Sequence, residues 1–410
     1  MKFTELLQRT LKSSPDKEDL SKNAVLLTKA GYVNCLMSGV YSFLPLGLRV
    51  LRKIENIVRE EMDKLGGQEI LMPALTPKTI WETTGRYDAI DVLFKLKGCN
   101  NKDLVLAATH EEVATPLAGT FVNSYKDLPL YTYQIQTKFR NELRAKSGIL
   151  RGREFRMKDL YSFHTSQEDL DNFYEKVIVA YKNIFAKCGI GDRTILTYAS
   201  GGAFSKYSHE FQAITNAGED IVYKVGDIGI NDEIIDDENV LKEFNIKNKN
   251  DLETVKTVEI GNIFKLGTKF TAPCGMKYTD KDGNLQTPVM GCYGIGTTRL
   301  MGTVVECLAD EKGLIWPEAI SPFKYHLVCL TNKEDEIQQC NEIYNTLIAR
   351  GVDVLYDDRK ASNGEKLNDA DLMGITNRLV VSGRTLKEGK IELKKRNESD
   401  AKLITIEEIK

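Results

Sequence analysis

The sequence predicts a protein of the α+β class, with a large domain over residues 1–321 and a small α/β domain over residues 322–410. Three observations support this prediction. The 410 residues are enough for two or three domains at roughly 100–200 residues each. Short strand patterns with Gly-containing turns run from about residue 195 to 290. After Pro322, strand and helix patterns alternate in a compact series.

The first domain is predicted to open with a helix followed by a strand. Apolar residues recur at three- and four-residue steps from Leu51 to Leu65, and Gly66-Gly67 end the helix. The segment QEILMP then predicts a strand that Pro73 closes. A second helix is predicted over residues 166–189, because Ser166 is a suitable N-cap and a buried stripe follows it, formed by Leu170, Phe173, Val177, Ala180 and Ile184.

The end of the first domain and the small domain follow from the same kind of pattern. Residues 231–251 are acidic and rich in Asn and Lys, which predicts a surface excursion, and the strand-like TPVMGCYG (287–294) leads into the helical TTRLMGTVVECLA (297–309). WPEAISPF is typical of a linker. Beyond it, four strand patterns and two helical patterns alternate, at residues 325–330, 334–350, 352–358, 365–374, 378–383 and 389–395. This alternation favours a largely parallel sheet.

Positive charge is concentrated locally. The formal net charge is −3 and the pI is about 6.0, so no global positive field attracts nucleic acid or membranes. The stretch FRNELRAKSGILRGREFRMKD (139–159) nevertheless holds seven Arg or Lys residues against three acidic ones. We therefore expect an anionic ligand at this stretch.

Cysteine usage and the N-terminus indicate a cytoplasmic protein. The eight cysteines include no C-x-x-C pair and do not cluster with the four histidines, which argues against a zinc knuckle or a disulfide scaffold. The N-terminus lacks an apolar segment, and Glu5, Asp16 and Glu18 fit poorly with a transit peptide. No run of about 18 apolar residues occurs, so we expect no membrane association.

The basic stretch is predicted to form two antiparallel strands, residues 139–144 and 151–157, joined by a loop centred on Ser147-Gly148. Side chains alternate along a strand, so one wall can present Arg140, Glu142 and Arg144 beside Arg151, Arg153, Phe155 and Met157. Guanidinium groups bind phosphates, a carboxylate accepts from an adenine amino group, and a ring stacks on a base. The set suits ATP, although a salt-bridged surface hairpin has the same pattern.

Two other short motifs suggest ligand contacts. In GIGTTR (294–299), Gly294 and Gly296 precede a helix, so the main chain can approach an anion while Arg299 adds a charge. The spacing is not G-x-G-x-x-G and no βαβ unit surrounds it, which argues against a Rossmann nucleotide site. In ATHEE (108–112), Thr109 and Glu111 can present a hydroxyl and a carboxylate to a substrate ammonium group.

Taken in order, these segments resemble the motifs of class II aminoacyl-tRNA synthetases, and of the bacterial-type prolyl-tRNA synthetases in particular. QEILMPALTP resembles motif 1, FRNE…RGREFRMKD motif 2 and MGCYGIGTTR motif 3. Other similar segments are GVYSFLPLGLRVLRKIENIVREEM, WETTGRY, SHEFQ, VEIGNIFKLGTKF and GVDVLYDDR. The resemblance spans nearly the whole chain. It implies a catalytic core on an antiparallel sheet, an anticodon-binding domain, and a homodimer with motif 1 at its interface.

The resemblance also implies a reaction and the residues for it. The protein would activate L-proline with ATP, helped by Mg²⁺, and charge tRNA(Pro). Arg140 would hold the ATP α-phosphate and the prolyl carboxyl group, while Arg151 and Arg299 would bind the outer phosphates. Glu142 and Phe155 would bind adenine. Thr109 and Glu111 would bind the imino nitrogen of proline.

Further residues are placed near the substrates or the RNA by the same resemblance. They are Glu259, Gly261, Gly294 and Gly296 beside the substrates, His209 and Phe211 at the proline pocket, and Asp358, Arg359 and Lys366 at the anticodon. Three alternatives stay open: a core position for His209 and Phe211, a plain bulge at Gly261, and a generic flavodoxin-like α/β module for the small domain.

The sequence departs from the resemblance in two places. Residues 164–286 hold a helix, strands and the acidic excursion where many bacterial relatives carry a large editing domain, so the chain resembles the short form without it. We therefore expect alanine to be mischarged, because a pocket cannot sterically exclude a smaller competitor. The family's G-G-S-G before SHEF is replaced by G-G-A-F-S-K-Y, so the wall near proline is expected to differ.

Two other functions were weighed against this one. A threonyl or histidyl synthetase would share motifs 1 to 3, but the prolyl-like segments outside those motifs argue against it. A non-catalytic tRNA-binding paralogue should have lost Arg140, Glu142 or Arg299, and all three are present.

Overall fold

The computed structural model of the chain describes residues 1–7, 9–11, 21–202 and 204–410. Asp16 and Glu18, used above for the N-terminus, and Ala203 of G-G-A-F-S-K-Y lie outside the described residues. Contacts divide the chain into two compact units. The core unit comprises residues 38–40 and 55–303, and the terminal unit comprises residues 1–37, 41–54 and 304–410.

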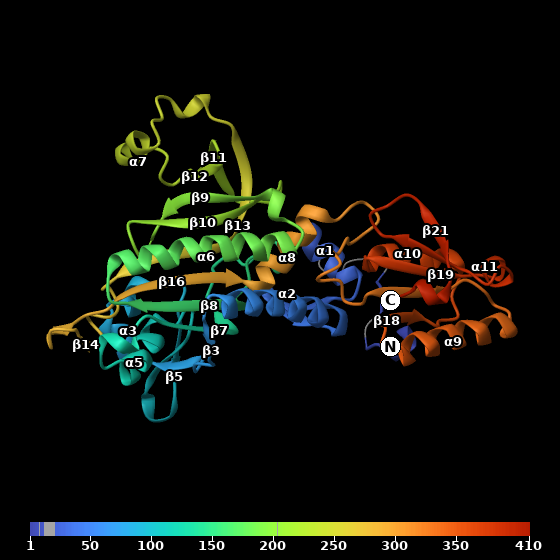
Figure 1. Ribbon diagram of the computed structural model, residues 1–410, viewed down its shortest axis with the longest axis horizontal. Helices are drawn as coiled ribbons and strands as arrows, with labels where there is room; N and C mark the ends of the chain where they lie inside the picture. The colour runs from blue at the N-terminus through green and yellow to red at the C-terminus, as the bar shows by residue number, and fades with distance from the viewer. Residues whose placement is uncertain (8, 12–20, 203) are drawn as a thin grey trace. The chain divides into compact units, whose positions relative to one another are not determined.

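A large sheet forms the core unit (Figure 1). Within the described residues it has nine strands in the order β10-β9-β12-β11-β13-β16-β8-β7-β3. Their bounds are Tyr207–Ile214, Thr194–Ser200, Ile228–Asn231, Asp220–Val225, Thr254–Gly267, Val289–Gly296, Glu154–His164, Leu130–Phe139 and Gln68–Glu69, in that order. The neighbouring strands β13, β16, β8 and β7 pair antiparallel, which confirms the expected antiparallel core.

Helix α6 (Gln167–Lys187) packs on this sheet against β8, β13 and β16 (Figure 1). The Ser166 hydroxyl accepts from the main-chain N–H of Asp169 at 3.2 Å, as an N-cap does. The predicted apolar stripe from Leu170 to Ile184 is buried. Both the helix and its buried face are therefore confirmed.

The arginine hairpin exists, but its strands are displaced from the predicted ones. Strands β7 and β8 pair from Leu130 with Phe163 to Phe139 with Glu154, so residues 140–153 form a loop. Ser147 and Gly148 at its tip have positive φ, and an isolated bridge joins Lys146 to Arg151. The predicted strand 139–144 is thus wrong except at Phe139, whereas the predicted strand 151–157 is correct from Glu154 onward. Side chains continue to alternate along β7 and β8, and the apolar residues of these strands are buried in the sheet. Burial therefore determines which residues pair as strands, so the paired region lies further from the loop than the sequence pattern predicted.

Helix α2 (Pro45–Lys64) is confirmed, but the strand after it is shorter than QEILMP. The main-chain N–H of Ile70 still donates to Tyr133 O at 2.8 Å, whereas that of Met72 donates to the Gln134 side chain at 3.0 Å. At Met72 the Gln134 side chain therefore accepts in place of a main-chain carbonyl of β7, and β3 ends at Glu69.

Smaller elements surround the sheet. A three-stranded sheet has the order β4-β6-β5 (Leu75–Pro77, Asp103–Leu106, Phe94–Lys97), and β14 (Tyr278–Thr279) pairs with β15 (Leu285–Gln286). The short helices α3 (Lys78–Thr83), α4 (Arg86–Ala89) and α5 (Glu111–Phe121) accompany the three-stranded sheet, and α7 (Glu238–Glu243) lies in the predicted acidic excursion. Because α5 begins at Glu111, the ATHEE segment forms a strand-to-helix junction.

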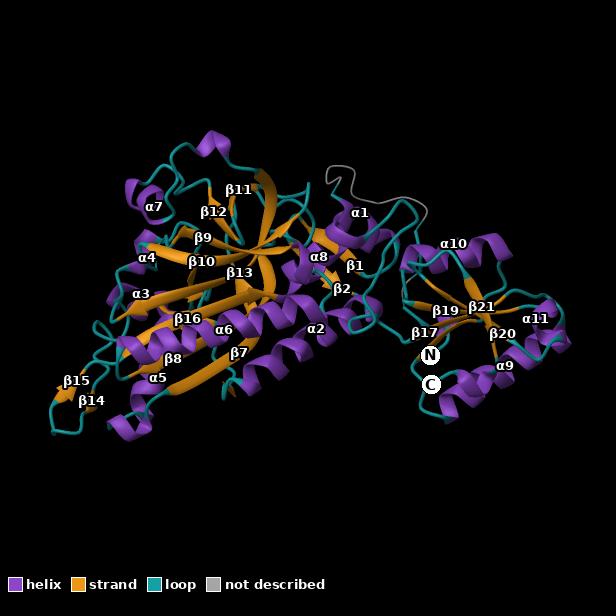
Figure 2. Ribbon diagram, turned by 45° about the horizontal axis from the view of Figure 1, so that its top comes forward, coloured by secondary structure: helices purple, strands orange, loops and turns teal. Residues whose placement is uncertain are grey.

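The terminal unit contains the small α/β domain (Figure 2). Its sheet has the order β18-β17-β19-β20-β21 (Val354–Asp357, Tyr325–Cys329, Asn377–Val381, Ile391–Lys395, Ala401–Ile404). Helices α9 (Glu334–Ala349) and α10 (Asn363–Met373) cover opposite faces (Figure 2). The unit also contains α1 (Lys22–Lys29) and β1 (Val33–Met37), while β2 (Val40–Phe43), α2 and α8 (Thr297–Leu308) contribute residues to both units.

The prediction of a largely parallel small sheet is only half right. Strands β18, β17 and β19 are parallel, but β20 and β21 are antiparallel. Between β19 and β20 lies only the five-residue helix α11 (Gly383–Lys387). A parallel crossover needs a dozen or more residues, so this short connection forces the antiparallel pairing.

Within the described ranges, no helix has the length and apolar character needed to cross a membrane.

Candidate active site

Two cavities in the core unit share Arg140, Glu259 and Arg299. Cavity A, of about 230 Å³, is lined in addition by Glu142, Ser147, Leu150, Arg151, Ala217, Glu219, Asp220, Thr257 and Val258. Cavity B, of about 180 Å³, is lined in addition by Thr109, Glu111, Phe155, Met157, Asp159, Phe204, Ile260, Gly261, Asn262, Phe264, Cys292, Gly294 and Gly296. Nearly all the core residues predicted for the site therefore line one cavity or both.

Arg140 is the cation at the junction of the two cavities. It follows the last residue of β7, and its main-chain N–H donates to Arg153 O at 2.9 Å. The guanidinium lies 5.2 Å from the centre of the Phe155 ring, so the two side chains share a wall as predicted. Among the described residues the guanidinium has no hydrogen-bond or ion-pair partner. Burial and the nearby Arg299 lower its pKa, which means that its charge is destabilised until an anion binds.

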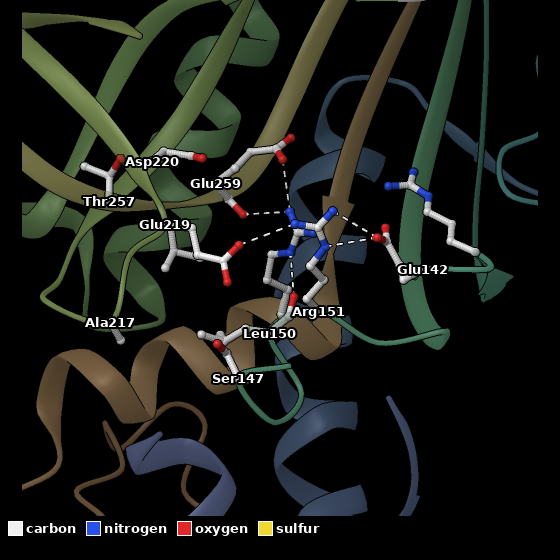
Figure 3. Close-up of a pocket in the computed structure, with 12 residues that line it drawn as sticks. Glu142, Ser147, Leu150, Arg151, Ala217, Glu219, Asp220, Thr257 and Glu259 are labelled. Carbon is white, nitrogen blue, oxygen red and sulfur yellow. Dashed lines mark hydrogen bonds and ion pairs between the residues drawn. The ribbon is translucent and has the colours of Figure 1, made fainter. Parts of the chain in front are cut away.

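Arg151, by contrast, is held by carboxylates in cavity A. Its Nε donates to Glu142 Oε2 at 3.0 Å, and a second nitrogen lies 3.3 Å from Glu219 Oε2. Figure 3 shows Arg151 with these two carboxylates on either side of it. Burial lowers the pKa of Arg151, but the contacts with Glu142 outweigh this and the net shift is upward. A phosphate that enters cavity A therefore competes with carboxylates for this guanidinium.

Arg299 is fixed by the first turn of α8. Its Nε donates to Leu150 O at 2.9 Å, and its NH1 group donates to Glu259 O at 3.1 Å and to Glu259 Oε2 at 3.0 Å. Helix α8 begins at Thr297, directly after β16, so its positive N-terminal end lies next to Gly296 of cavity B. The strand-to-helix junction predicted from GIGTTR is present.

The Glu111 carboxylate of cavity B accepts three hydrogen bonds. Its Oε2 accepts from Thr109 Oγ1 at 2.6 Å and from Arg86 NH1 at 3.1 Å, and its Oε1 accepts from Cys292 Sγ at 3.0 Å. Burial raises the pKa of the Cys292 thiol well above its usual range, so the thiol stays protonated and donates a hydrogen bond to Glu111. Three donors thus fix the orientation of one carboxylate that faces the cavity.

A buried network lies beneath this carboxylate. Lys138 Nζ is 2.8 Å from Asp159 Oδ1 and 2.6 Å from His110 Nδ1, and His110 Nε2 is 3.0 Å from Pro73 O. Burial, and then the charge of Lys138, lower the pKa of His110 to about 4. His110 is therefore neutral near pH 7, with Nδ1 accepting from Lys138 and Nε2–H donating to Pro73. It lines neither cavity and supports the ATHEE turn from behind.

Strand alternation accounts for several site residues that the sequence analysis missed. Asp159 follows Phe155 and Met157 at two-residue steps on β8, and Cys292 precedes Gly294 and Gly296 in the same way on β16. The two-residue period could have found both, starting from the residues already assigned. Arg86 and Phe204 lie in the quoted segments WETTGRY and G-G-A-F-S-K-Y, but their contacts join parts of the chain that are far apart, so no residue pattern singled them out.

Gly261 lies at a bulge and also lines cavity B. Phe211 of β10 faces Gly261, while the next residue, Gln212, faces Glu259, so Ile260 is the extra residue of β13. A Cβ at Gly261 would lie 3.1 Å from Tyr181 Cε2 of α6, whereas one at Gly294 would have no neighbour closer than 3.9 Å. Gly261 is therefore next to a bulge and in the wall of cavity B at the same time, so the two alternatives do not exclude each other.

His209 and Phe211 are not among the described residues that line the cavities. Phe211 is buried against the rings of Tyr181 and Phe185. His209 Nδ1 lies 2.9 Å from Tyr174 OH, and burial lowers the pKa of this imidazole to about 4. Their surroundings match the core alternative.

The three residues predicted for the anticodon make contacts inside the terminal unit. Asp358 accepts from Thr4 Oγ1 at 2.6 Å. Arg359 forms ion pairs with Asp357 and Asp369, and Lys366 is buried and donates to Cys329 O at 2.9 Å. Asp358 and Arg359 are partly exposed at the end of β18, whereas Lys366 holds main-chain carbonyls from within.

Comparisons with known proteins identify the family of the chain. A family model described as the tRNA synthetase class II core domain (G, H, P, S and T) matches residues 94–307, and one described as an anticodon binding domain matches residues 324–410. The proline–tRNA ligase of Anaplasma phagocytophilum is 38% identical over 418 residues, covering 97% of this chain and 97% of the relative. The chain belongs to the proline–tRNA ligase family.

A longer proline–tRNA ligase, from Thermosipho africanus, is 33% identical over 544 residues, covering 97% of this chain and 96% of the relative. That alignment exceeds the 410 residues of this chain, so the relative has inserted residues that this chain lacks. The Anaplasma alignment, over 418 residues, is only slightly longer than this chain, so it needs no insertion of that size. The chain therefore has the length of the short proline–tRNA ligases.

Solved structures share the fold of this proline–tRNA ligase family member. The prolyl-tRNA synthetase of Giardia lamblia in complex with prolyl-adenylate has a TM-score of 0.77 at 21% identity, covering 94% of this chain and 74% of that chain. The synthetase of Cryptosporidium parvum, complexed with halofuginone and AMPPNP, has a TM-score of 0.77 at 17% identity, covering 93% of this chain and 74% of that chain. The class II core model spans five specificities, and the curated relatives narrow them to proline rather than threonine or histidine.

Proposed function

We propose that this chain activates L-proline with ATP and transfers the prolyl group to tRNA(Pro), without a cis-editing domain. The observation that carries the proposal is the placement of Arg140. It has no anionic partner among the described residues, and it lines both a cavity rich in arginine and one that presents a buried carboxylate. Such a cation suits the bond that forms between a carboxylate and a phosphate.

In the first step, a carboxylate oxygen of proline forms a bond to the α-phosphorus of ATP. The bond from that phosphorus to the oxygen it shares with the β-phosphate breaks, and pyrophosphate leaves. Arg140 neutralises charge on the α-phosphate and on the attacking carboxylate, while Arg151 and Arg299 bind the outer phosphates. In the second step, a hydroxyl at the tRNA 3′ end attacks the prolyl carbonyl carbon and AMP leaves. The protein thus contributes positioning and charge stabilisation, and no side chain acts as a nucleophile.

Cavity B supports recognition of proline. The secondary ammonium group of proline can donate to the Glu111 carboxylate and to the Thr109 hydroxyl, which already form one unit. Phe204, Phe264 and Met157 supply apolar walls for the ring. Adenine is assigned to Phe155, by stacking, and to Glu142, which would accept from the amino group.

Magnesium is proposed as a companion of ATP. Glu259 and Asp220 line cavity A and offer carboxylate oxygens. Among the described residues, no group of three or more His, Cys, Asp or Glu side chains could hold a metal ion. Mg²⁺ usually binds one or two carboxylates together with substrate phosphates, so Glu259 and Asp220 would hold it beside ATP. The ion would neutralise negative charge on the triphosphate.

The remaining assignments are proposals on the same basis. We assign aminoacylation to residues 1–321 and anticodon binding to residues 322–410, with Asp358 and Arg359 facing the RNA and Lys366 bracing them. We propose a homodimer, because β3 is an edge strand and Leu71 and Leu75 beside it are exposed. We also propose a cytoplasmic location. A monomer mass by light scattering at micromolar concentration would contradict the dimer.

The deciding experiment is ATP–pyrophosphate exchange with each amino acid in turn. We expect exchange driven chiefly by proline, with a weaker signal for alanine. Exchange driven by threonine or histidine would replace the proposed specificity. No exchange with any amino acid would favour the non-catalytic alternative.

A further inference from the structure

Arg86 joins two parts of cavity B without lining it. Its NH1 group donates to Glu111 Oε2 at 3.1 Å and to Glu112 Oε1 at 2.9 Å. The carbon at the centre of its guanidinium lies 4.6 Å from the centre of the Phe204 ring, and Phe204 lines the cavity. One side chain therefore contacts both the carboxylate assigned to proline and a wall of the same pocket.

The surroundings leave Arg86 little freedom. It is 4% exposed and begins the short helix α4, directly after Gly85, whose φ of 71° is left-handed. The rings of Phe270 and Trp81 lie 5.1 Å and 5.9 Å from the centre of its guanidinium. A cation enclosed by aromatic faces and tied to two carboxylates holds one orientation.

The charges of this cluster are also informative. Glu111 and Glu112 are both buried, and Arg86 is the guanidinium that the structure places on both of them. Burial raises the pKa of the Glu112 carboxyl. Its Oε1 accepts from Arg86 and from Thr84 Oγ1, each at 2.9 Å, and Glu112 is not among the residues that line the two cavities. Glu112 thus serves to anchor Arg86, while Glu111 faces the substrate.

We propose that Arg86 is a positioning residue that sets the affinity for proline by fixing Glu111 and supporting Phe204. This inference rests on the proposed function, because it assigns proline to cavity B. Phe204 lies in the segment G-G-A-F-S-K-Y, which departs from the family resemblance. Arg86 touches neither substrate and acts through these two residues.

The test is proline- and ATP-dependent pyrophosphate exchange by R86K and R86M. A misplaced binding group can cost about 100-fold, so we expect KM for proline to rise about 100-fold in R86M and about tenfold in R86K. KM for ATP should stay within about twofold of the wild type, because no ATP-binding group contacts Arg86. Lysine should rescue the binding of proline only in part. It keeps the positive charge, but it lacks the planar guanidinium that donates to two carboxylates and stacks on aromatic rings.

R144M is the matched control. Arg144 is also an arginine of the core unit, but it is exposed and lines neither cavity, so KM for proline should change by less than about threefold. The inference is overturned if R144M matches R86M, or if R86M raises both KM values equally. It also fails if R86M leaves KM for proline unchanged. Thermal unfolding of each variant identifies any that do not fold, and R86K then decides.

Failure of this inference and failure of the proposed function are distinguishable. If the wild-type protein supports no proline-dependent exchange, the proposed function is wrong whatever Arg86 does. If the wild type uses proline and the Arg86 variants bind it normally, only the positioning role is wrong.

Discussion

At the scale of single residues, the site is a set of charges with unequal numbers of partners. Arg151 and Arg299 contact carboxylates in the free protein, whereas Arg140 faces only the Phe155 ring among the described residues. An unpaired, partly buried guanidinium is costly, and the fold tolerates it where a ligand will supply the anion. This asymmetry supports the proposal that the reacting atoms bind at Arg140.

Replacing Arg140 by lysine should remove most of the activity. R140K keeps one positive charge but loses the planar fork that binds two oxygens, so we expect proline-dependent exchange to fall about 100- to 1,000-fold. Arg144 lies exposed in the same loop and lines neither cavity, which makes R144K the control, expected to exchange normally. Equal losses in the two variants would show that the loop, and not the guanidinium, matters.

Lys158 should make stability depend on pH. Its Nζ donates to Tyr181 OH at 2.5 Å and to Tyr293 O at 2.9 Å, and burial lowers its pKa from 10.5 to about 7. The unfolded chain binds this proton up to about pH 10.4, so between pH 7 and that value the unfolded state binds more protons. The free energy of unfolding therefore gains a contribution that rises with pH in this window.

Urea unfolding at pH 7 and pH 9.5 measures this contribution. K158M should lack the rise, whereas K176M, on the exposed face of α6, should behave like the wild type. Parallel pH dependence of K158M and the wild type would mean that Lys158 keeps its proton when folded.

At the scale of elements, cavity B depends on how closely β13 approaches α6. An added Cβ at Gly261 meets the Tyr181 ring of α6 at 3.1 Å and Gly294 O at 3.3 Å. Overpacking of this kind costs about 1–3 kcal/mol, so G261A should lower the free energy of unfolding by that amount. Chemical denaturation measures it.

G294A is the matched comparison, because Gly294 lines the same cavity and its Cβ would have only ordinary contacts at 3.9 Å and beyond. We expect unchanged stability and weaker binding of proline, since the added methyl group narrows the cavity. Equal destabilisation by the two changes would contradict the packing argument.

The same elements explain how far the sequence alone could lead. Helix α6 was predicted with its cap and its buried face, because both signals are local to one segment. The hairpin was predicted with its strands displaced, because its ends depend on burial beneath the sheet as well as on alternation. The antiparallel pairing of β20 could have been predicted from its short connection to β19. The sequence analysis instead applied the general rule that alternating strands and helices form a parallel sheet.

The site follows the same division. Arg140, Glu142, Phe155, Thr109 and Glu111 lie in short motifs, and the structure places them along the two cavities. Arg86, Phe204, Glu219 and Asp220 reach the site only through contacts across the fold. His209 and Phe211 were named from a motif, and the structure sets them against the aromatic rings of the core. Residues that act through tertiary contacts leave no pattern in a single sequence.

At the scale of the whole molecule, the described residues between β8 and β16 form α6, strands β9 to β15 and α7, without a further domain. We expect the purified protein to form Ala-tRNA(Pro). Each missing methylene lowers affinity by only about 10- to 200-fold, and alanine enters wherever proline fits. Charging of tRNA(Pro) with labelled alanine measures this. The absence of that product, with proline charging intact, would mean that cavity B rejects alanine by other means.

Arg140, Glu259 and Arg299 line both cavities, so ATP and proline, placed as proposed, would contact the same three side chains. Thermodynamic reciprocity then applies: if a bound ATP analogue changes the dissociation constant of proline by some factor, proline must change that of the analogue by the same factor. If ATP and proline bind as proposed, we expect the three shared side chains to make the two substrates mutual effectors before any bond between them forms.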